Sequence, residues 1–179
     1  MFDLESRLSR VVIGVDPAIT HHEKSDETGI IVAGVGVDEN FYILEDLSGR
    51  YRPNEWAEKV IEAYDRYGAD RVVAEVNQGG DMVENTLRMV DARISYKGVR
   101  ATKGKILRAE PISALYEKGR VFHRCCFQKL EDQMCRFTGE REAGESPDRL
   151  DALVWALTEL ALSPQAPGAP RVWAFDPGK

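Results

Sequence analysis

Cysteine and histidine are scarce in this chain of 179 residues, which contains three of each. The cysteines form no C-x-x-C pair, so we predict no structural zinc site and a reducing compartment; they are Cys125, Cys126 and Cys135. His21–His22 is an adjacent pair, and we interpret it as solvated, because neighbouring residues on an extended loop rarely bind one ion. His123 lies beside the cysteines but completes no four-ligand spacing, which favours a packed or surface position.

Long apolar runs are also missing. No segment approaches the roughly 20 apolar residues of a membrane span, and the N-terminal MFDLESRLSR lacks the apolar centre of a signal peptide. The net charge of −6 argues against a protein that coats nucleic acid through bulk positive charge, although a nuclease with an acidic metal site stays compatible with it. The segment 98–106 fails the G-x-x-x-x-G-K-[ST] pattern, because five residues separate its glycines and Ile106 follows Lys105, so ATP hydrolysis by a P-loop is excluded.

The most informative stretch that is present is Val11–Asp16, a short apolar run that ends in a carboxylate. Such runs are typical of buried central strands, and alternation places Val12, Gly14 and Asp16 on one face. Pro17 ends the strand because proline has no N–H for the ladder. An ionised carboxylate at a buried strand end is costly unless it is paired, so we expect either a cation there or a turn that Asp16 caps.

The remaining pattern predicts an α/β protein. Two β-rich runs at 28–37 and 41–47 follow a polar loop and indicate an antiparallel three-strand meander. Helices and strands then alternate, at 53–67, 71–76, 81–90, 94–99, 105–118, 121–122, 127–137 and from 146 onward. This order predicts a mixed sheet of five or more strands flanked by helices. We expect one domain over residues 1–162 and an extended or flexible tail over 163–179, where SPQAPGAP occurs.

Four acidic residues from distant segments could meet in this fold. Glu75 interrupts the apolar run of the fourth strand, as Asp16 ends the first, and Asp148 and Asp151 lie three apart on the last helix. If the two strands are neighbours, the acids lie at one end of the sheet, where like charges repel unless a cation is present. Mg²⁺ or Mn²⁺ prefers oxygen ligands, and two such ions about 3.5–4 Å apart would activate a water and stabilise the leaving oxygen in phosphodiester cleavage.

Each acid also has an ordinary structural interpretation. Glu75 could pair with Arg71 or another base, and Asp148 could simply stabilise a helix N-terminus through the dipole. Asp151 lies one turn further along the helix, where the dipole explains it less well. The loop acids at 26–27 are interpreted as solvated, and Trp155 as a packing residue on the apolar stripe of the last helix.

A basic segment stands out against the negative net charge. Between positions 93 and 108 there are six basic residues and no acid: Arg93, Lys97, Arg100, Lys103, Lys105 and Arg108. They could contact DNA phosphates beside the acidic site, or they could form a solvated face that balances nearby acids. No base-reading motif is visible, so we expect weak sequence specificity and steeply salt-dependent binding.

Taken together, these segments resemble the C-terminal nuclease domain of tailed-phage terminase large subunits and their relatives in gene transfer agents. The resemblance covers most of the chain, in the family's order. It is carried by VVIGVDPAIT (11–20), SDETGI (25–30), VVAEVNQGGDMVE (72–84), KGKILRAEPISALYEKGRV (103–121) and SPDRLDALVWALTEL (146–160).

The resemblance implies an RNase H-like fold, close to that of Holliday-junction resolvases, and a metal-dependent endonuclease that cuts concatemeric viral DNA in the bacterial cytoplasm. It implies Asp16, Glu75, Asp148 and Asp151 as catalytic metal ligands, with Asp151 favoured over Asp148 as the indispensable helix acid. Lys103, Lys105 and Arg108 lie within the matching stretch and are the first choice for DNA contacts, followed by Arg100 and Lys97.

The family also implies partners, namely double-stranded DNA, a packaging ATPase domain, a small terminase subunit and a portal. This sequence carries no such ATPase, so we expect an excised nuclease domain in which Met1 is a start introduced by cloning or processing. Two alternatives stay open: a junction resolvase on the same fold, or a catalytically silent module that only docks on DNA or a portal.

Overall fold

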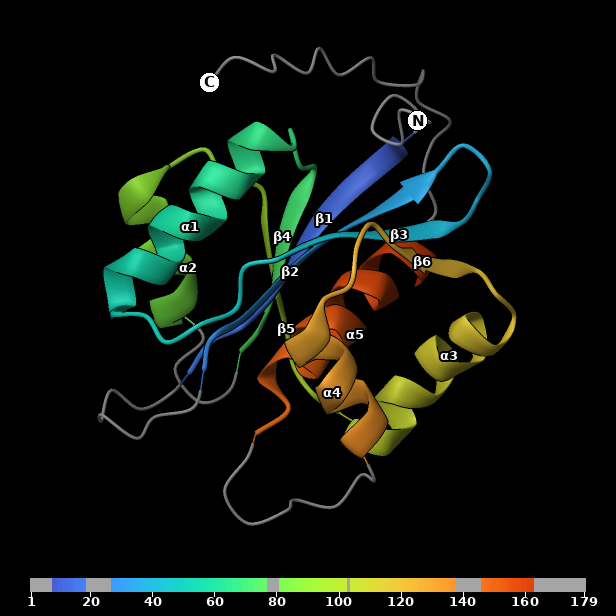
Figure 1. The fold of residues 1–179 in the computed structure, drawn as a ribbon. Coiled ribbons are helices and arrows are strands. Elements are labelled where there is room, and N and C mark those ends of the chain that lie inside the picture. The colour runs from blue at the N-terminus through green and yellow to red at the C-terminus, as the bar shows by residue number, and fades with distance from the viewer. Residues whose placement is uncertain (1–7, 19–26, 77–80, 103, 138–145, 163–179) are drawn as a thin grey trace.

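A six-stranded mixed sheet forms the centre of the molecule, with strand order β5-β4-β1-β2-β3-β6 (Figure 1). The computed structural model describes residues 8–18, 27–76, 81–102, 104–137 and 146–162, without the side chains of Pro53 and Asp81. The strands are β1 (Leu8–Asp16), β2 (Gly29–Gly36), β3 (Phe41–Asp46), β4 (Arg71–Glu75), β5 (Tyr96–Val99) and β6 (Val121–His123). The first three form the predicted antiparallel meander, and β4 pairs in parallel with β1, so the predicted fold class is confirmed.

Helices cover both faces of the sheet, with α1 and α2 on one face and α3, α4 and α5 on the other (Figure 1). Their bounds are α1 (Pro53–Arg66), α2 (Asp81–Val90), α3 (Lys105–Glu117), α4 (Gln128–Arg136) and α5 (Asp148–Leu162). Helix α1 begins at Pro53, as predicted, and ends before Gly68, which adopts a positive φ of 48° that suits glycine after a helix. None of the helices in the described part of the chain is long and apolar enough to span a membrane.

Some predicted boundaries are shifted by local hydrogen bonding. Ile94 and Ser95 precede β5, because the Ile94 amide bonds the Asp91 carbonyl in a turn at 3.3 Å. The last helix begins at Asp148 and not at 146, and the Pro147 carbonyl accepts a hydrogen bond from the Asp151 amide at 2.9 Å. Pro111 lies inside a continuous α3, where it is exposed, so it does not end that helix as its sequence position could suggest. Residues 77–80, between the predicted elements at 71–76 and 81–90, and the predicted tail from 163 onward lie outside the described residues.

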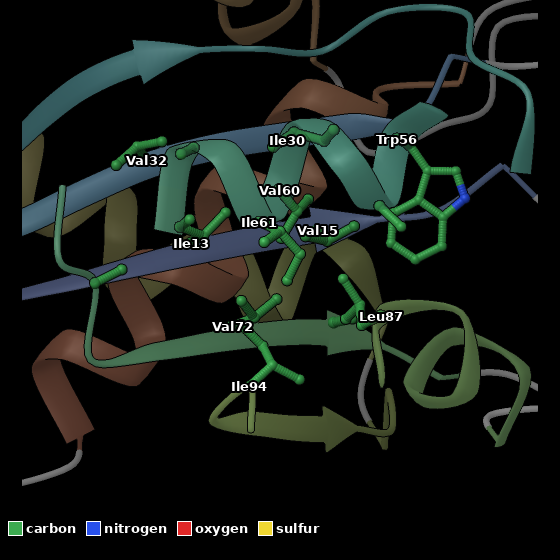
Figure 2. Packing of buried hydrophobic residues seen from close by; sticks show 14 of the residues in the cluster. Ile13, Val15, Ile30, Val32, Trp56, Val60, Ile61, Val72, Leu87 and Ile94 are labelled. Atoms are coloured by element: carbon green, nitrogen blue, oxygen red, sulfur yellow. The ribbon is translucent and has the colours of Figure 1, made fainter. Parts of the chain in front are cut away.

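The central strands divide their side chains between two hydrophobic clusters. Ile13 and Val15 of β1 pack toward α1 and α2, against residues such as Trp56, Val60 and Leu87 (Figure 2). The alternate residue, Val12, joins the opposite cluster, which contains the buried face of α5. The predicted alternation along β1 is therefore confirmed. This alternation places Gly14 on the face of the sheet that α5 covers.

Two glycines allow α5 to lie directly on the sheet. A Cβ atom at Gly14 would overlap the Ala152 carbonyl and lie 2.9 Å from Cβ of Ala156. A Cβ atom at Gly29, the partner of Asp16 across β1 and β2, would overlap the Asp148 carbonyl. Because both positions lack a side chain, the first turns of α5 approach the ends of β1 and β2 closely. This contact brings the acidic end of the helix to the acidic end of the strand.

The variant Gly14→Ala should test this close approach. Its methyl group would push α5 away from β1, and overpacking of this kind typically costs about 1–3 kcal/mol. We expect the free energy of unfolding, measured by guanidinium denaturation, to fall by this amount. Gly104→Ala is the matched control, because no atom lies within 4 Å of an added Cβ there, and its effect should stay below about 1 kcal/mol. Equal effects in both variants would contradict the packing argument.

Candidate active site

Asp16 and Glu75 lie side by side at the C-terminal ends of two neighbouring strands inside the sheet. Strands β1 and β4 are parallel neighbours, and Val15 is registered with Ala74. Asp16 and Glu75 are the next residues on the two strands, and each is its strand's last residue. The strand pairing that the sequence left open therefore places the two carboxylates next to each other.

Helix α5 adds two further carboxylates beside these strand ends. Asp148 and Asp151 lie one turn apart, and they are only 6% and 5% exposed. The helix N-terminus stabilises negative charge there through the dipole. That effect alone does not explain why both acids are buried beside two strand-end acids.

The pKa of Asp16 reports how strongly these groups interact. Burial raises this pKa well above its usual range, and the negative charges of Asp151, Glu75 and Asp148 raise it further, while Lys105 lowers it. Burial also raises the pKa of Asp151, against the lowering effects of Lys105 and Arg108. Carboxylates from three distant segments thus share one electrostatic environment.

Two basic residues of α3 reach into this cluster. Lys105 donates to Oδ2 of Asp151, and Arg108 Nη1 donates to Oε2 of Glu75 at 3.1 Å. Arg108 Nη2 also lies 3.7 Å from Oδ1 of Asp151, with only 10% of the arginine side chain exposed. Within the described segments, no group of three or more aspartate, glutamate, histidine or cysteine side chains is arranged so that it could hold a metal ion. Cations from α3 instead contact two of the carboxylates.

Trp155 also contacts the acidic site. Its Nε1–H donates to Oε2 of Glu75 at 2.9 Å, and the Arg108 guanidinium lies 4.6 Å from the centre of its ring. The sequence predicts a packing role for this residue, and its 7% exposure agrees with that. The hydrogen bond to Glu75 is an additional role that the apolar pattern of α5 does not reveal.

Arg149 holds the surrounding loops in place. This 4% exposed residue donates to Oδ2 of Asp46 at 3.0 Å, to the Ser48 carbonyl at 3.1 Å and to Glu27. The expectation that Glu27 is solvated is therefore wrong, because a buried guanidinium binds it, while Asp26 lies outside the described residues. These contacts of Arg149 connect the segment before β2 and the end of β3 to the first turn of α5.

The predicted DNA-contacting residues separate into several environments. Lys97 donates to Oε2 of Glu159 at 2.7 Å, in a cluster that also contains Arg10 and Arg71. Arg71 thus pairs with Glu159 and not with Glu75, which was one alternative. Arg100 is exposed, and Lys103 lies outside the described residues, as do His21 and His22. His123 bonds the Tyr116 hydroxyl at 2.8 Å and Glu131 at 3.0 Å, which agrees with the predicted packed or surface position.

Comparison with known proteins identifies the family. The family model described as the terminase RNase H-like domain matches residues 13–160. The chain belongs to this family. The match spans β1 to α5 and therefore includes every element that carries a residue of the acidic cluster.

Solved structures show the same fold at low sequence identity. The large terminase nuclease from the thermophilic phage G20c matches at 19% identity and TM-score 0.61, over 84% of this chain and 82% of that chain. A variant nuclease domain of the large terminase subunit gp2 of bacterial virus Sf6, with manganese and beta-thujaplicinol, matches at 13% identity and TM-score 0.60, over 84% and 89%. RuvC of T. thermophilus with a Holliday junction substrate matches at 18% and 0.51, over 83% and 92%. A search of curated proteins found no match.

The other three predicted acids therefore lie within electrostatic range of Asp16, and residues to which the sequence assigned other roles lie beside them. Terminase family membership leaves the metal-ligand roles of Asp16, Glu75, Asp148 and Asp151 as predictions. Lys105 and Arg108 had a detectable signal, because they belong to the run of six basic residues without an acid between positions 93 and 108. Arg149 and Trp155 had none, because their partners come from segments about 80 or more positions away.

Proposed function

We propose that this chain is a divalent-metal-dependent DNA endonuclease that cuts concatemeric viral DNA during genome packaging. The observation that carries the proposal is the placement of Asp16 and Glu75 at the ends of two adjacent parallel strands, with the buried Asp148 and Asp151 of α5 within electrostatic range of Asp16. Membership of the terminase family supports the packaging role. In that role an ATPase domain, a small subunit and a portal would work with the nuclease in the cytoplasm of a bacterial host.

The residues fit Mg²⁺ or Mn²⁺ by their chemistry. Four carboxylates supply only oxygen donors, which hard divalent cations prefer. Burial raises the pKa of Asp16, and the charges of Asp151, Glu75 and Asp148 raise it further, so a divalent cation bound there would favour the ionised carboxylate. We propose Asp16, Glu75, Asp148 and Asp151 as the ligands, with two ions bound.

Bound ions would lower the pKa of the attacking water and stabilise charge on the leaving oxygen of the phosphodiester. The protein's part is to hold the carboxylates in place. Close packing of α5 on Gly14 and Gly29 fixes Asp148 and Asp151 relative to Asp16. Lys105 and Arg108 lie directly beside the carboxylates, where their positive charges would also attract a DNA phosphate.

DNA is the proposed substrate, with backbone contacts from Lys103, Lys105 and Arg108 and with Arg100 nearby. Lys97 pairs with Glu159, which lies outside the acidic cluster, whereas Lys105 and Arg108 pair with carboxylates of the proposed site itself. Contacts of this kind recognise phosphates and carry no sequence information, so the intact packaging machinery would select the cut site.

The test is cleavage of supercoiled plasmid by the purified chain. We expect nicking and linearisation with Mn²⁺ or Mg²⁺, no product with EDTA, and recovery when excess metal is restored. Binding should weaken steeply between about 50 and 200 mM salt. A homogeneous, folded protein that leaves plasmid intact with every divalent ion would refute the proposed function and favour the silent docking module.

The resolvase alternative makes a different substrate prediction. RuvC shares the fold, and a resolvase would prefer four-way junctions over linear or supercoiled duplex. We expect comparable cleavage of all three substrates by this chain. Strong preference for the four-way junction, with symmetric paired cuts, would replace the terminase interpretation with the resolvase one.

A further inference from the structure

The indole of Trp155 is a hydrogen-bond donor built into the wall of the acidic site. It lies one turn beyond Asp151 on α5, is 7% exposed, and donates from Nε1 to Oε2 of Glu75 at 2.9 Å. The side chain of Glu75 is itself only 10% exposed. A buried indole N–H needs a partner, and here the partner is a carboxylate oxygen of the acidic cluster.

A second donor reaches the same oxygen of Glu75. Arg108 Nη1 donates to Oε2 at 3.1 Å, and its guanidinium is 4.6 Å from the centre of the Trp155 ring. The ring therefore supports Arg108 by a cation–π contact as well as bonding Glu75 directly. Within the described part of the chain, no hydrogen-bond donor reaches the other oxygen, Oε1.

The two oxygens of Glu75 thus have different environments. Oε2 accepts hydrogen bonds from two donors, on α5 and α3, and Oε1 accepts none from the described part of the chain. Donors that bind the far oxygen of a ligating carboxylate fix its orientation, and their loss typically lowers metal affinity about 10–100-fold.

We propose that Trp155 is a positioning residue that anchors Glu75 through Oε2, so that Oε1 is presented to a divalent cation. The inference rests on the proposed function, because it takes Glu75 as a metal ligand. It goes further by giving the indole N–H a role in metal affinity that a purely packing residue would not have.

Trp56 provides a matched control within the same chain. It is also 7% exposed, but it belongs to the hydrophobic cluster on the opposite face of the sheet, with α1 (Figure 2). Substitution of either tryptophan by phenylalanine removes an indole from a core. Trp155→Phe removes the donor to Glu75 and keeps an aromatic ring beside Arg108, whereas Trp56→Phe affects neither contact.

The experiment measures Mn²⁺ binding without DNA, by electron paramagnetic resonance of free Mn²⁺, in wild type, Trp155→Phe, Trp56→Phe and Glu75→Gln. We expect the Kd for Mn²⁺ to rise about 10–100-fold in Trp155→Phe and less than about threefold in Trp56→Phe. In cleavage assays Trp155→Phe should need correspondingly more Mn²⁺, and saturating Mn²⁺ should restore most of its rate.

A second measurement uses the wild-type protein, in case Trp155→Phe does not fold. The indole N–H resonances of the three tryptophans, assigned with Trp56→Phe and Trp173→Phe, are followed in ¹⁵N spectra during Mg²⁺ addition. The Trp155 signal should shift with the binding curve, the Trp56 signal should not, and Glu75→Gln should abolish the response.

The possible failures are distinguishable. Wild-type affinity in Trp155→Phe, with binding lost in Glu75→Gln, overturns the positioning role and leaves the proposed function intact. A Trp155 resonance that does not shift over the Mg²⁺ concentrations at which binding occurs would also overturn the positioning role and leave the proposed function intact. Absence of Mn²⁺ binding by wild type refutes the proposed function and this inference together.

Discussion

Asp16→Asn should lose metal-dependent DNA cleavage by at least about 10³-fold, which corresponds to roughly 4 kcal/mol of transition-state stabilisation. Asparagine keeps the size of the side chain and one oxygen, but it removes the charge at the point where four carboxylates interact. The measurement is the rate of plasmid nicking at saturating Mn²⁺. Full activity in this variant would show that Asp16 is no metal ligand.

The fold of this variant should survive, and the pKa of Asp16 gives the reason. That pKa is raised in the folded, metal-free protein, so the carboxyl group's contribution to stability is greatest at pH values below the unfolded pKa and is lost as the pH rises through the folded value. Without metal at pH 8, Asp16→Asn should therefore be at least as stable as wild type.

Thermal unfolding with EDTA at pH 8 and at pH 4 tests whether the Asp16 carboxylate destabilises the metal-free fold at high pH. The stability advantage of Asp16→Asn should shrink at the lower pH. Adding Mn²⁺ should raise the Tm of wild type much more than that of the variant, because a ligand stabilises only a fold that binds it. Lower stability of the variant at pH 8 would contradict the argument, and its activity loss would then reflect misfolding.

Glu159→Gln should lower the free energy of unfolding by about 3–5 kcal/mol, because it breaks a buried ionic cluster. Oε1 of Glu159 lies 2.9 Å from both Arg10 and Arg71, and Oε2 lies 2.7 Å from Lys97, with 3% of the carboxylate side chain exposed. Glutamine keeps the shape but leaves the 8% exposed Arg10 without this negative charge. The midpoint of urea unfolding, with its slope unchanged, measures the loss.

Two controls separate the buried cluster from surface charge. Glu62→Gln removes an acid that pairs with Lys59 at 3.3 Å on the exposed side of α1, and it should cost less than about 1 kcal/mol. The double variant Arg10→Leu with Glu159→Leu should recover much of the lost stability, since apolar replacement of a buried pair is often close to neutral. A loss in Glu159→Gln no larger than that in Glu62→Gln would show that the cluster does not anchor α5 to β1.

The sequence alone determined most of the secondary-structure elements of this protein and its candidate site residues. Alternation along Val11–Asp16 located a central strand with an acid at its end, because periodicity reflects burial on two faces. Glu75 is recognised by the same reasoning, since acids are rare in buried apolar segments, whereas Asp148 and Asp151 are indicated by their spacing on one helical face and by the family resemblance. These signals are local in the chain, so no tertiary structure was needed to find them.

Only the tertiary structure decided which groups touch. The pairing of β1 with β4 and the approach of α5 over Gly14 and Gly29 place the acids together, and neither contact is encoded by spacing along the chain. The partners of Trp155 and Glu159 were likewise invisible, because each lies on another element, far away in sequence. Hydrogen bonds and ion pairs act over a few ångströms in space, so their partners follow from packing and not from sequence order.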